Sequence, residues 1–327
     1  MIKLVRRSFV GALIALATCA TFGLSAHAQG TYPDRPIKLL VGYQPGGGAD
    51  LTARIIAPKL SEMFKVPVVV ENRAGASGMI AEGALAKAPP DGYTLLVDPI
   101  GIVMNPSLFR KISYDPINEI LPVAQLVTLN FVIVTNPSVP ARTISELVEV
   151  MRTRPKQINV ATAGASTQLT AELFRLTTNV ELTFVPYKGS APASTAVIAG
   201  ETQVMFSDMP SVAQHISNGR LRAIAVTGSK RAAALPEVPT AKEGGLSNFE
   251  VASWFGLFAP AGTPSEIVNK LNAAANEIVM MPDVVTRFER LGAEPSQLSA
   301  QEFARIYRSE LERWRDVVSR ARIPLND

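Results

Sequence analysis

Short β-rich runs alternate with helix-length amphipathic segments along almost the whole chain. Most of these runs are continuously apolar rather than alternating, which is typical of strands covered by helices on both faces. The pattern therefore predicts an α/β fold. The predicted strands are 37–42, 66–71, 94–98, 131–135, 158–162, 182–186, 203–206, 221–227 and 251–259.

The first 28 residues have the features of a secretory signal peptide. They contain a basic start at 3–7, an apolar stretch at 9–20 and an A-x-A cleavage signal at 26–28. The apolar stretch is shorter than the roughly 20 residues that span a bilayer. We expect a secreted chain that begins at about Gln29, with a lipoprotein signal ending at Cys19 as a minor alternative.

Removing the signal peptide changes the charge and the available chemistry. The signal peptide contains three of the 32 Lys and Arg residues, so the mature chain keeps 29 against 28 Asp and Glu. Its net charge of about +1 gives no case for nucleic-acid binding. Cys19 and His27 leave with it, so His215 is the single histidine of a cysteine-free mature chain. We therefore expect neither a metal site nor a cofactor, and a Ser-His-Asp triad would have to use His215.

Chain length and proline placement predict two lobes. About 300 mature residues exceed the usual size of one domain. Two proline-containing stretches, 114–127 and 229–250, bracket a middle block of strands and helices. We expect a discontinuous first lobe of 29–127 plus 246–327 and a second lobe of 128–245. Two side-by-side connections would form a hinge, with a ligand cleft between the lobes.

Three helix starts fit the capping-box pattern, in which a hydroxyl residue is followed three positions later by a glutamate. They begin at Thr143, Thr263 and Ser299, and Pro264 would occupy the first helical position. After Ser299, apolar residues recur at helical spacing through Trp314. This stripe favours core packing for Trp314 over ligand stacking.

The stretch "GYQPGGGAD" joins the first predicted strand to a helix. A strand, a glycine loop and a helix N-terminus together suit an anion. No lysine follows Gly48, Leu51 stands where a dinucleotide loop needs glycine, and Asp50 would repel a highly charged phosphate. Two alternatives remain with equal weight: a backbone site for a small carboxylate, and a tight turn without a ligand.

Further strand ends carry glycine, hydroxyl and amide residues. They lie around 75–78, 99–105, 164–168, 187–188 and 208. Ordinary helix capping alone explains Ser166 or Thr167. The chain shows no nucleophile paired with a base, so this inventory suits binding better than catalysis, and we expect no enzymatic activity.

Several motifs together resemble the Bug-type periplasmic solute-binding proteins, the receptors of tripartite tricarboxylate transporter systems. The resemblance covers essentially the whole mature chain. The motifs that carry it are "YPDRPIKLLVGYQPGGGADLTAR", "VPVVVENRAGASGMIA", "PPDGYTLL", "NPSLF", "ISYDP", "FVPYKGSAPA", "SWFGLFAPAGTP" and "LGAEP".

The resemblance implies a type II periplasmic-binding fold, with two α/β lobes that close on a carboxylated ligand. In the family, the loops matching 45–50 and 99–102 hold one carboxylate with backbone groups and water. The loop matching 164–168, with Tyr187 and Asp208, is expected to sort ligands by their distal end. The implied ligand-binding residues are Tyr43, Pro45, Gly47, Gly48, Ala49, Asp50, Gly101, Ile102, Gly164, Ala165, Ser166, Thr167, Gln168, Tyr187 and Asp208.

This chain departs from the family pattern where the ligand should be selected. Gln168 replaces a common histidine, Ser207 replaces a frequent acidic residue, and Gln44 follows Tyr43 where a small or apolar residue is usual. The sequence predicts a monomeric periplasmic receptor that delivers a small carboxylic acid to membrane permease subunits. The alternatives are a ligand-sensing subunit for a signalling partner and, less favoured, a secreted hydrolase or transferase.

Overall fold

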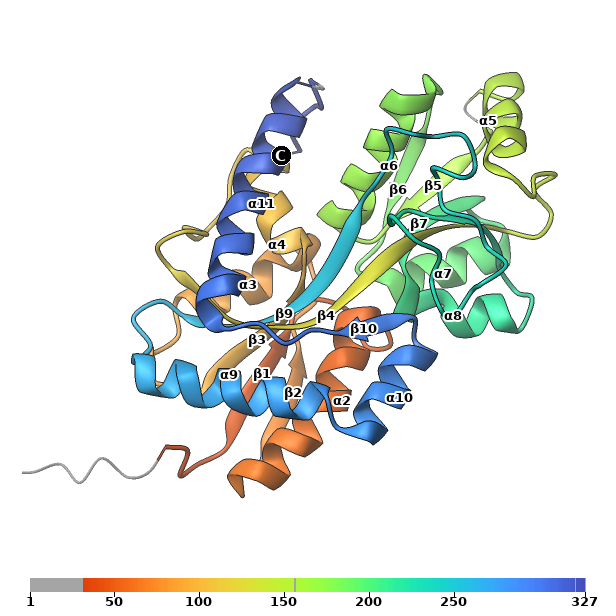
Figure 1. The fold of residues 1–327 in the computed structure, drawn as a ribbon. Coiled ribbons are helices and arrows are strands. Elements are labelled where there is room, and N and C mark those ends of the chain that lie inside the picture. Colours follow the sequence, from red (N-terminus) through yellow and green to blue (C-terminus); the bar gives the residue numbers. More distant parts are fainter. Residues whose placement is uncertain (1–31, 156, 321, 327) are drawn as a thin grey trace, which may run out of the picture. The chain divides into compact units, whose positions relative to one another are not determined.

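The computed structural model describes residues 32–155, 157–320 and 322–326, and one folded unit begins at Arg35 (Figure 1). The predicted signal peptide lies outside the described residues. No helix among them is long and apolar enough to cross a membrane. The strands are β1 (Ile37–Val41), β2 (Val68–Asn72), β3 (Thr94–Pro99), β4 (Ile120–Thr135), β5 (Asn159–Thr162), β6 (Thr183–Pro186), β7 (Val204–Asp208), β8 (Arg222–Val226), β9 (Ala252–Pro260) and β10 (Ala293–Pro295).

Helices follow most of the strands, as the alternating pattern predicts. They are η1 (Ala76–Gly78, a 3₁₀ turn), α2 (Gly48–Phe64), α3 (Met79–Ala86), α4 (Gly101–Leu108), α5 (Ile144–Thr153), α6 (Ala165–Thr178), α7 (Ser190–Ala199), α8 (Met209–Ser217), α9 (Ser265–Val279), α10 (Pro282–Arg290) and α11 (Ala300–Arg320). His215 lies in the last turn of α8.

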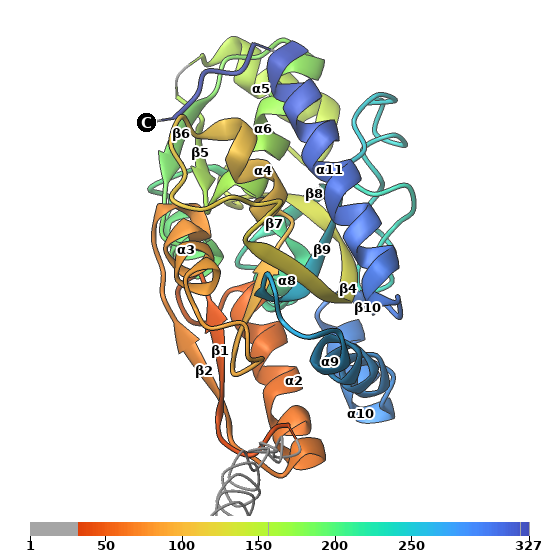
Figure 2. The same cartoon turned by 90° about the vertical axis from the view of Figure 1, so that its left-hand side faces the viewer.

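The strands form one mixed sheet in the order β2-β1-β3-β9-β4-β7-β5-β6, with β8 and β10 also paired to β4. Strand β1 runs parallel to β2 and β3, and β5 runs parallel to β6 and β7. The long strand β4 joins these two parallel groups, because its residues 120–130 pair with β9 and its residues 131–135 pair with β7 (Figures 1 and 2).

We call the group around β1, β2, β3 and β9 the first half of the sheet and the group around β5–β8 the second half. The chain enters the second half along β4 and returns along the neighbouring strand β9, so two adjacent strands connect the halves. The predicted lobe boundaries at 127/128 and 245/246 stay predictions.

Strand β4 begins earlier than predicted. The sequence predicts a strand over 131–135, but β4 already begins at Ile120, within the proline-containing stretch 114–127. Proline cannot donate to a strand ladder, and it is accommodated where the ladder is irregular. The β4–β9 register shifts between Pro122 and Ala124, which is such a position.

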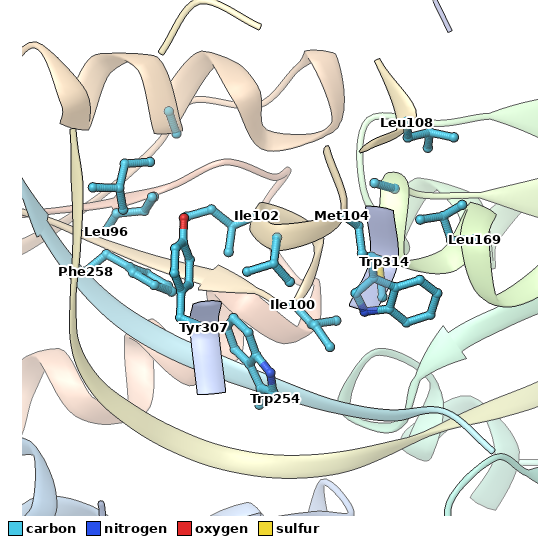
Figure 3. Close-up of a cluster of buried hydrophobic side chains, with 14 of the residues drawn as sticks. Leu96, Ile100, Ile102, Met104, Leu108, Leu169, Trp254, Phe258, Tyr307 and Trp314 are labelled. Carbon is cyan, nitrogen blue, oxygen red and sulfur yellow. The ribbon is translucent and has the colours of Figure 1, made fainter. Parts of the chain in front are cut away.

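Helix α11 packs its apolar stripe into the core of the first half, as predicted. Phe303, Tyr307 and Trp314 are fully or almost fully buried, together with residues of α4 and β9 (Figure 3). The Trp314 Nε1–H group donates to Glu310 Oε2 at 2.8 Å, so the polar edge of the indole has a partner within the same helix. Trp314 is therefore a core residue.

Two of the three predicted capping boxes are confirmed. Thr143 Oγ1 accepts from the Glu146 backbone N–H while Glu146 accepts from the Thr143 N–H. Ser299 and Glu302 exchange the same pair of bonds. The prediction at Thr263 is wrong: α9 starts one residue later than expected, with Pro264 as its N-cap, and the Thr263 hydroxyl donates to the Pro260 carbonyl.

Replacing the α5 cap should measurably destabilise the fold. We expect Thr143→Ala to lower the free energy of unfolding by about 1 kcal/mol, because it leaves the Glu146 N–H without its side-chain acceptor. Urea unfolding measures this change. The control Thr153→Ala removes an exposed hydroxyl at the other end of the same helix and should change stability by less than about 0.5 kcal/mol. Equal losses from the two variants would contradict the capping role.

Candidate ligand-binding site

Four helix N-termini meet around one small cavity where the two halves of the sheet come together. The first turns of α2, α6 and α7 and the N-cap residue of α8 all contribute to its wall. Each N-terminus carries a partial positive charge and backbone N–H groups, so their convergence favours an anionic group. The residues lining this inner cavity are Tyr43, Gly47, Gly48, Ala49, Pro99, Phe131, Ala163, Ser166, Thr167, Ser190, Asp208, Ser253 and Phe255.

The inner cavity is small. Its volume is about 20 Å³, which is room for about one water molecule. The backbone N–H of Gln44, in the loop after β1, donates to the carbonyl of Lys188 in the second half at 3.2 Å. The two halves are thus in direct contact beside the cavity, which in this arrangement is too small for a molecule much larger than water.

Asp50 stabilises the glycine loop rather than lining the cavity. Its carboxylate accepts from the Gly46 N–H at 2.9 Å, from Arg54 Nε at 2.9 and 3.0 Å, and from Asn72 Nδ2 at 2.9 Å. Burial alone would raise the pKa of Asp50, but the hydrogen bonds from Arg54, Gly46 and Asn72 hold this pKa below its ordinary value. The negative charge of Asp50 is therefore neutralised within the loop.

Gly48 is a point of close approach between the halves. Its N–H donates to Ser211 Oγ at 2.7 Å. A β-carbon at this position would lie 2.2 Å from Asp208 Oδ1 and 2.7 Å from Cζ of Phe255. At Gly47, by contrast, the nearest atom would be 3.8 Å away, an ordinary contact. The observed closure therefore requires glycine at position 48 and tolerates a side chain at position 47.

Asp208 is a buried carboxylate facing this helix N-terminus. It caps α8 by accepting from the Ser211 N–H at 3.1 Å, and it also accepts from the Ser211 hydroxyl at 2.5 Å and the Ser190 hydroxyl at 2.9 Å. Burial raises the pKa of Asp208, and the hydrogen bonds from Ser211 and Ser190 offset part of that rise.

The Tyr43 ring belongs to the walls of two cavities. Besides the inner cavity it lines an outer cavity of about 300 Å³. β-Carbons built at Gly78, Gly101 and Gly164 would lie 3.0 to 3.2 Å from the ring or its hydroxyl, so three glycines make room for it. The Tyr43 hydroxyl donates to the Ser77 carbonyl. The residues lining the outer cavity are Gly42, Tyr43, Gly75, Ala76, Ser77, Gly78, Ala163, Pro186, Tyr187 and Lys188.

The structure brings most, but not all, of the implied ligand-binding residues to these cavities. Pro45 is exposed, and Ile102 and Ala165 pack into the core of the first half (Figure 3 shows Ile102). Gln168 Oε1 accepts from Asn326 Nδ2 at 3.2 Å. The implied residues that line a cavity wall are Tyr43, Gly47, Gly48, Ala49, Ser166, Thr167, Asp208 and Tyr187. Gly101 and Gly164 lie beside the Tyr43 side chain.

Several residues that line or close the inner cavity are not among those predicted from the sequence. Phe131 and Phe255 lie within β4 and β9 rather than at strand ends, so a search of strand-end loops misses them. Ser190 and Ser211 lie in stretches that were noted, and each stands in the first turn of a helix that follows a strand. That position is the signal that could have identified them.

A pair of buried carboxyl groups lies behind Tyr43. Glu82 of α3 and Asp98 of β3 are both fully buried and lie close together. Glu82 accepts from Asn105 Nδ2 at 2.8 Å and from the Tyr114 hydroxyl. Burial raises the pKa of Glu82 to about 7 despite these bonds, and burial together with the charge of Glu82 raises the pKa of Asp98.

Comparison with known proteins decides the family. Residues 52–323 match the tripartite tricarboxylate transporter family receptor. The chain belongs to this receptor family. Protein BugT of Bordetella pertussis is 36% identical over 306 residues, which are 91% of this chain and 93% of BugT. The predicted Bug-type family is thereby confirmed. The family consists of binding receptors, so the prediction that the chain is not an enzyme is also confirmed.

Solved structures agree with the predicted fold class. R. palustris Rpa4515 with adipate has a TM-score of 0.87 and 34% identity, and covers 90% of this receptor and 100% of its own chain. Periplasmic binding protein BugD has a TM-score of 0.87 and 31% identity with the same coverage. MatC from Rhodopseudomonas palustris with bound malate has a TM-score of 0.84 and 34% identity, and covers 88% of this receptor and 100% of its own chain. The receptor has the α/β fold of these periplasmic binding proteins.

Proposed function

We propose that the receptor captures a small carboxylic acid in the periplasm and delivers it to a membrane permease. The observation that carries this proposal is the convergence of the α2, α6, α7 and α8 N-termini on the inner cavity. Backbone N–H groups of this kind suit a carboxylate. Rpa4515 with adipate and MatC with bound malate are similar to this receptor, which supports a carboxylate ligand here as well. The predicted signal peptide and the periplasmic binding proteins among the similar structures support the location.

Capture would proceed by separation and closure of the two halves. In the separated state, the α2 N-terminus offers its N–H groups to the ligand carboxylate. Contacts from Ser166, Thr167 and Asp208 of the second half are added only when the halves meet, so ligand binding favours closure. The outer cavity beyond Tyr43, bordered by Lys188, provides space for the rest of the molecule.

A thermal-shift panel of organic acids tests the proposal. The panel contains mono-, di- and tricarboxylic acids, amino acids and aromatic acids, and each acid is paired with its uncharged amide. At least one acid at about 100 times its Kd should stabilise the protein by about 2.7 kcal/mol, and its amide should not. If every acid leaves the melting temperature unchanged, the proposal is wrong.

Delivery to a permease is tested separately in cells. Deleting the receptor gene should abolish uptake of the stabilising acid at micromolar concentration, and the wild-type gene should restore it. Uptake that continues at the same rate without the receptor would contradict delivery while leaving the binding result intact.

A further inference from the structure

The α2 N-terminus, to which the proposed function assigns the ligand carboxylate, is bonded to the second half of the sheet. The Gly48 N–H donates to Ser211 Oγ at 2.7 Å, and both residues lie in the first turn of their helices. The Ser211 hydroxyl in turn donates to Asp208 Oδ1 at 2.5 Å. The protein therefore places one of its own hydroxyl groups, backed by a carboxylate, at this helix N-terminus.

This pair of side chains imitates a bound carboxylate. A helix N-terminus favours an acceptor that carries negative charge. The hydrogen bond to Asp208 polarises the Ser211 hydroxyl, so its oxygen is a stronger acceptor for the Gly48 N–H. Asp208 Oδ1 also lies against Gly48, because a β-carbon built there would be 2.2 Å from that oxygen.

A second bond joins the halves at the loop after β1. The Gln44 N–H donates to the Lys188 carbonyl at 3.2 Å. Two backbone donors of the first half, at Gln44 and Gly48, thus have acceptors within the protein itself. The inner cavity beside them has a volume of about 20 Å³. This arrangement, which we call self-closed, leaves neither donor unsatisfied and no large void between the halves.

We propose that Ser211 competes with the ligand carboxylate for the α2 N-terminus, so that the two halves close on each other without an acid. This inference rests on the proposed function, since it assumes that the acid binds at the Gly48 N–H. An acid then binds only after the Gly48–Ser211 bond has broken. The self-closed arrangement lowers the apparent affinity, because only the separated fraction of the receptor is competent to bind.

Ser211→Ala separates this competition from an ordinary ligand contact. Asp208 can still accept from the backbone N–H at position 211, so α8 keeps its N-cap and the fold is expected to persist. The Gly48 N–H loses its acceptor in the self-closed arrangement, and a buried donor without a partner is costly. In the acid complex the ligand carboxylate replaces that acceptor. Ser211→Ala should therefore bind the acid at least about threefold more tightly than the wild type.

Calorimetry with malate, with adipate and with the acid that stabilises the wild type most in the thermal-shift panel measures this gain. The control Ser217→Ala removes an exposed hydroxyl at the other end of α8, which donates to the Gln214 carbonyl. It should bind each acid as the wild type does. Wild-type or weaker affinity of Ser211→Ala overturns the inference, because Ser211 would then be neutral or an ordinary ligand contact.

Small-angle X-ray scattering tests self-closure in the absence of acid. The proteins are first unfolded, dialysed and refolded to remove retained acids. The wild type and Ser217→Ala should then be compact. Ser211→Ala should have a larger radius of gyration, which falls to the wild-type value when the acid is added. Equal radii for Ser211→Ala and the wild type overturn the inference, and so does a wild type that becomes compact only with acid.

The two experiments separate the inference from the proposed function. If acids bind the wild type and Ser211→Ala binds them more weakly, the proposed function stands and the inference is wrong. If no acid binds any of the three proteins, the proposed function fails. In that case a larger radius for Ser211→Ala would still support self-closure through the Gly48–Ser211 bond, and an unchanged radius would overturn it.

Discussion

The variant Gly48→Ala is expected to lower the free energy of unfolding of the ligand-free receptor by about 1 to 3 kcal/mol. The added methyl group would lie 2.2 Å from Asp208 Oδ1 and 2.7 Å from Phe255, so the two halves cannot keep the observed arrangement without displacing both side chains. Overpacking of a well-packed site has a cost of this size. Urea unfolding measures the change.

The neighbouring glycine provides a matched control. A β-carbon at Gly47 has no atom nearer than 3.8 Å, and Gly47 has φ −82°, a conformation open to alanine. Gly47→Ala should therefore change the free energy of unfolding by less than about 0.5 kcal/mol. Equal stabilities of the Gly48→Ala variant and the wild type would contradict the close contact of Gly48 with Asp208 and Phe255.

We expect the free energy of unfolding to fall as the pH rises from 5 to 8. Burial raises the pKa of Glu82 to about 7, and the pKa of Asp98 is raised as well. Between the unfolded and folded pKa values the native state binds more protons than the unfolded state, so stability falls with increasing pH. For Glu82 the loss is roughly 2 to 3 kcal/mol. Urea unfolding at pH 5 and pH 8 measures it.

Asp98→Asn isolates the carboxyl pair from other titrating groups. The raised pKa of Asp208 acts in the same direction, and the lowered pKa of His215 acts in the opposite one. Removing Asp98 leaves Glu82 without a buried carboxyl neighbour, and the amide can donate to it. The variant should be more stable than the wild type at pH 8, with a smaller decline between the two pH values. An identical decline in both proteins would contradict the assignment to this pair.

How far the sequence predicted the fold depended on the local pattern of each element. Strands made of continuous apolar runs, such as 94–98 and 251–259, appear within about one residue of their predicted ends. The first part of β4 was missed because Pro122 reads as a boundary, while in the structure a register shift absorbs it. Strand β10 has three residues, too few for a periodic signal.

In the candidate site, features that are local in the sequence were predictable and long-range contacts were not. The glycine loop was predictable, because a strand end, three glycines and a helix start are adjacent in the chain. The approach of Gly48 to Asp208 and Ser211 was not, because these residues are about 160 positions apart and only the sheet topology brings them together. The Glu82–Asp98 pair was not predicted either, because neither carboxylate has a local sequence signal.

A crystal structure of the receptor with its stabilising acid tests the central claim most directly. The account predicts a ligand carboxylate within about 3 Å of the backbone N–H groups in the first turn of α2, with residues from both halves of the sheet around the molecule. An acid bound elsewhere, with the inner cavity still closed and Gly48 still bonded to Ser211, would contradict it.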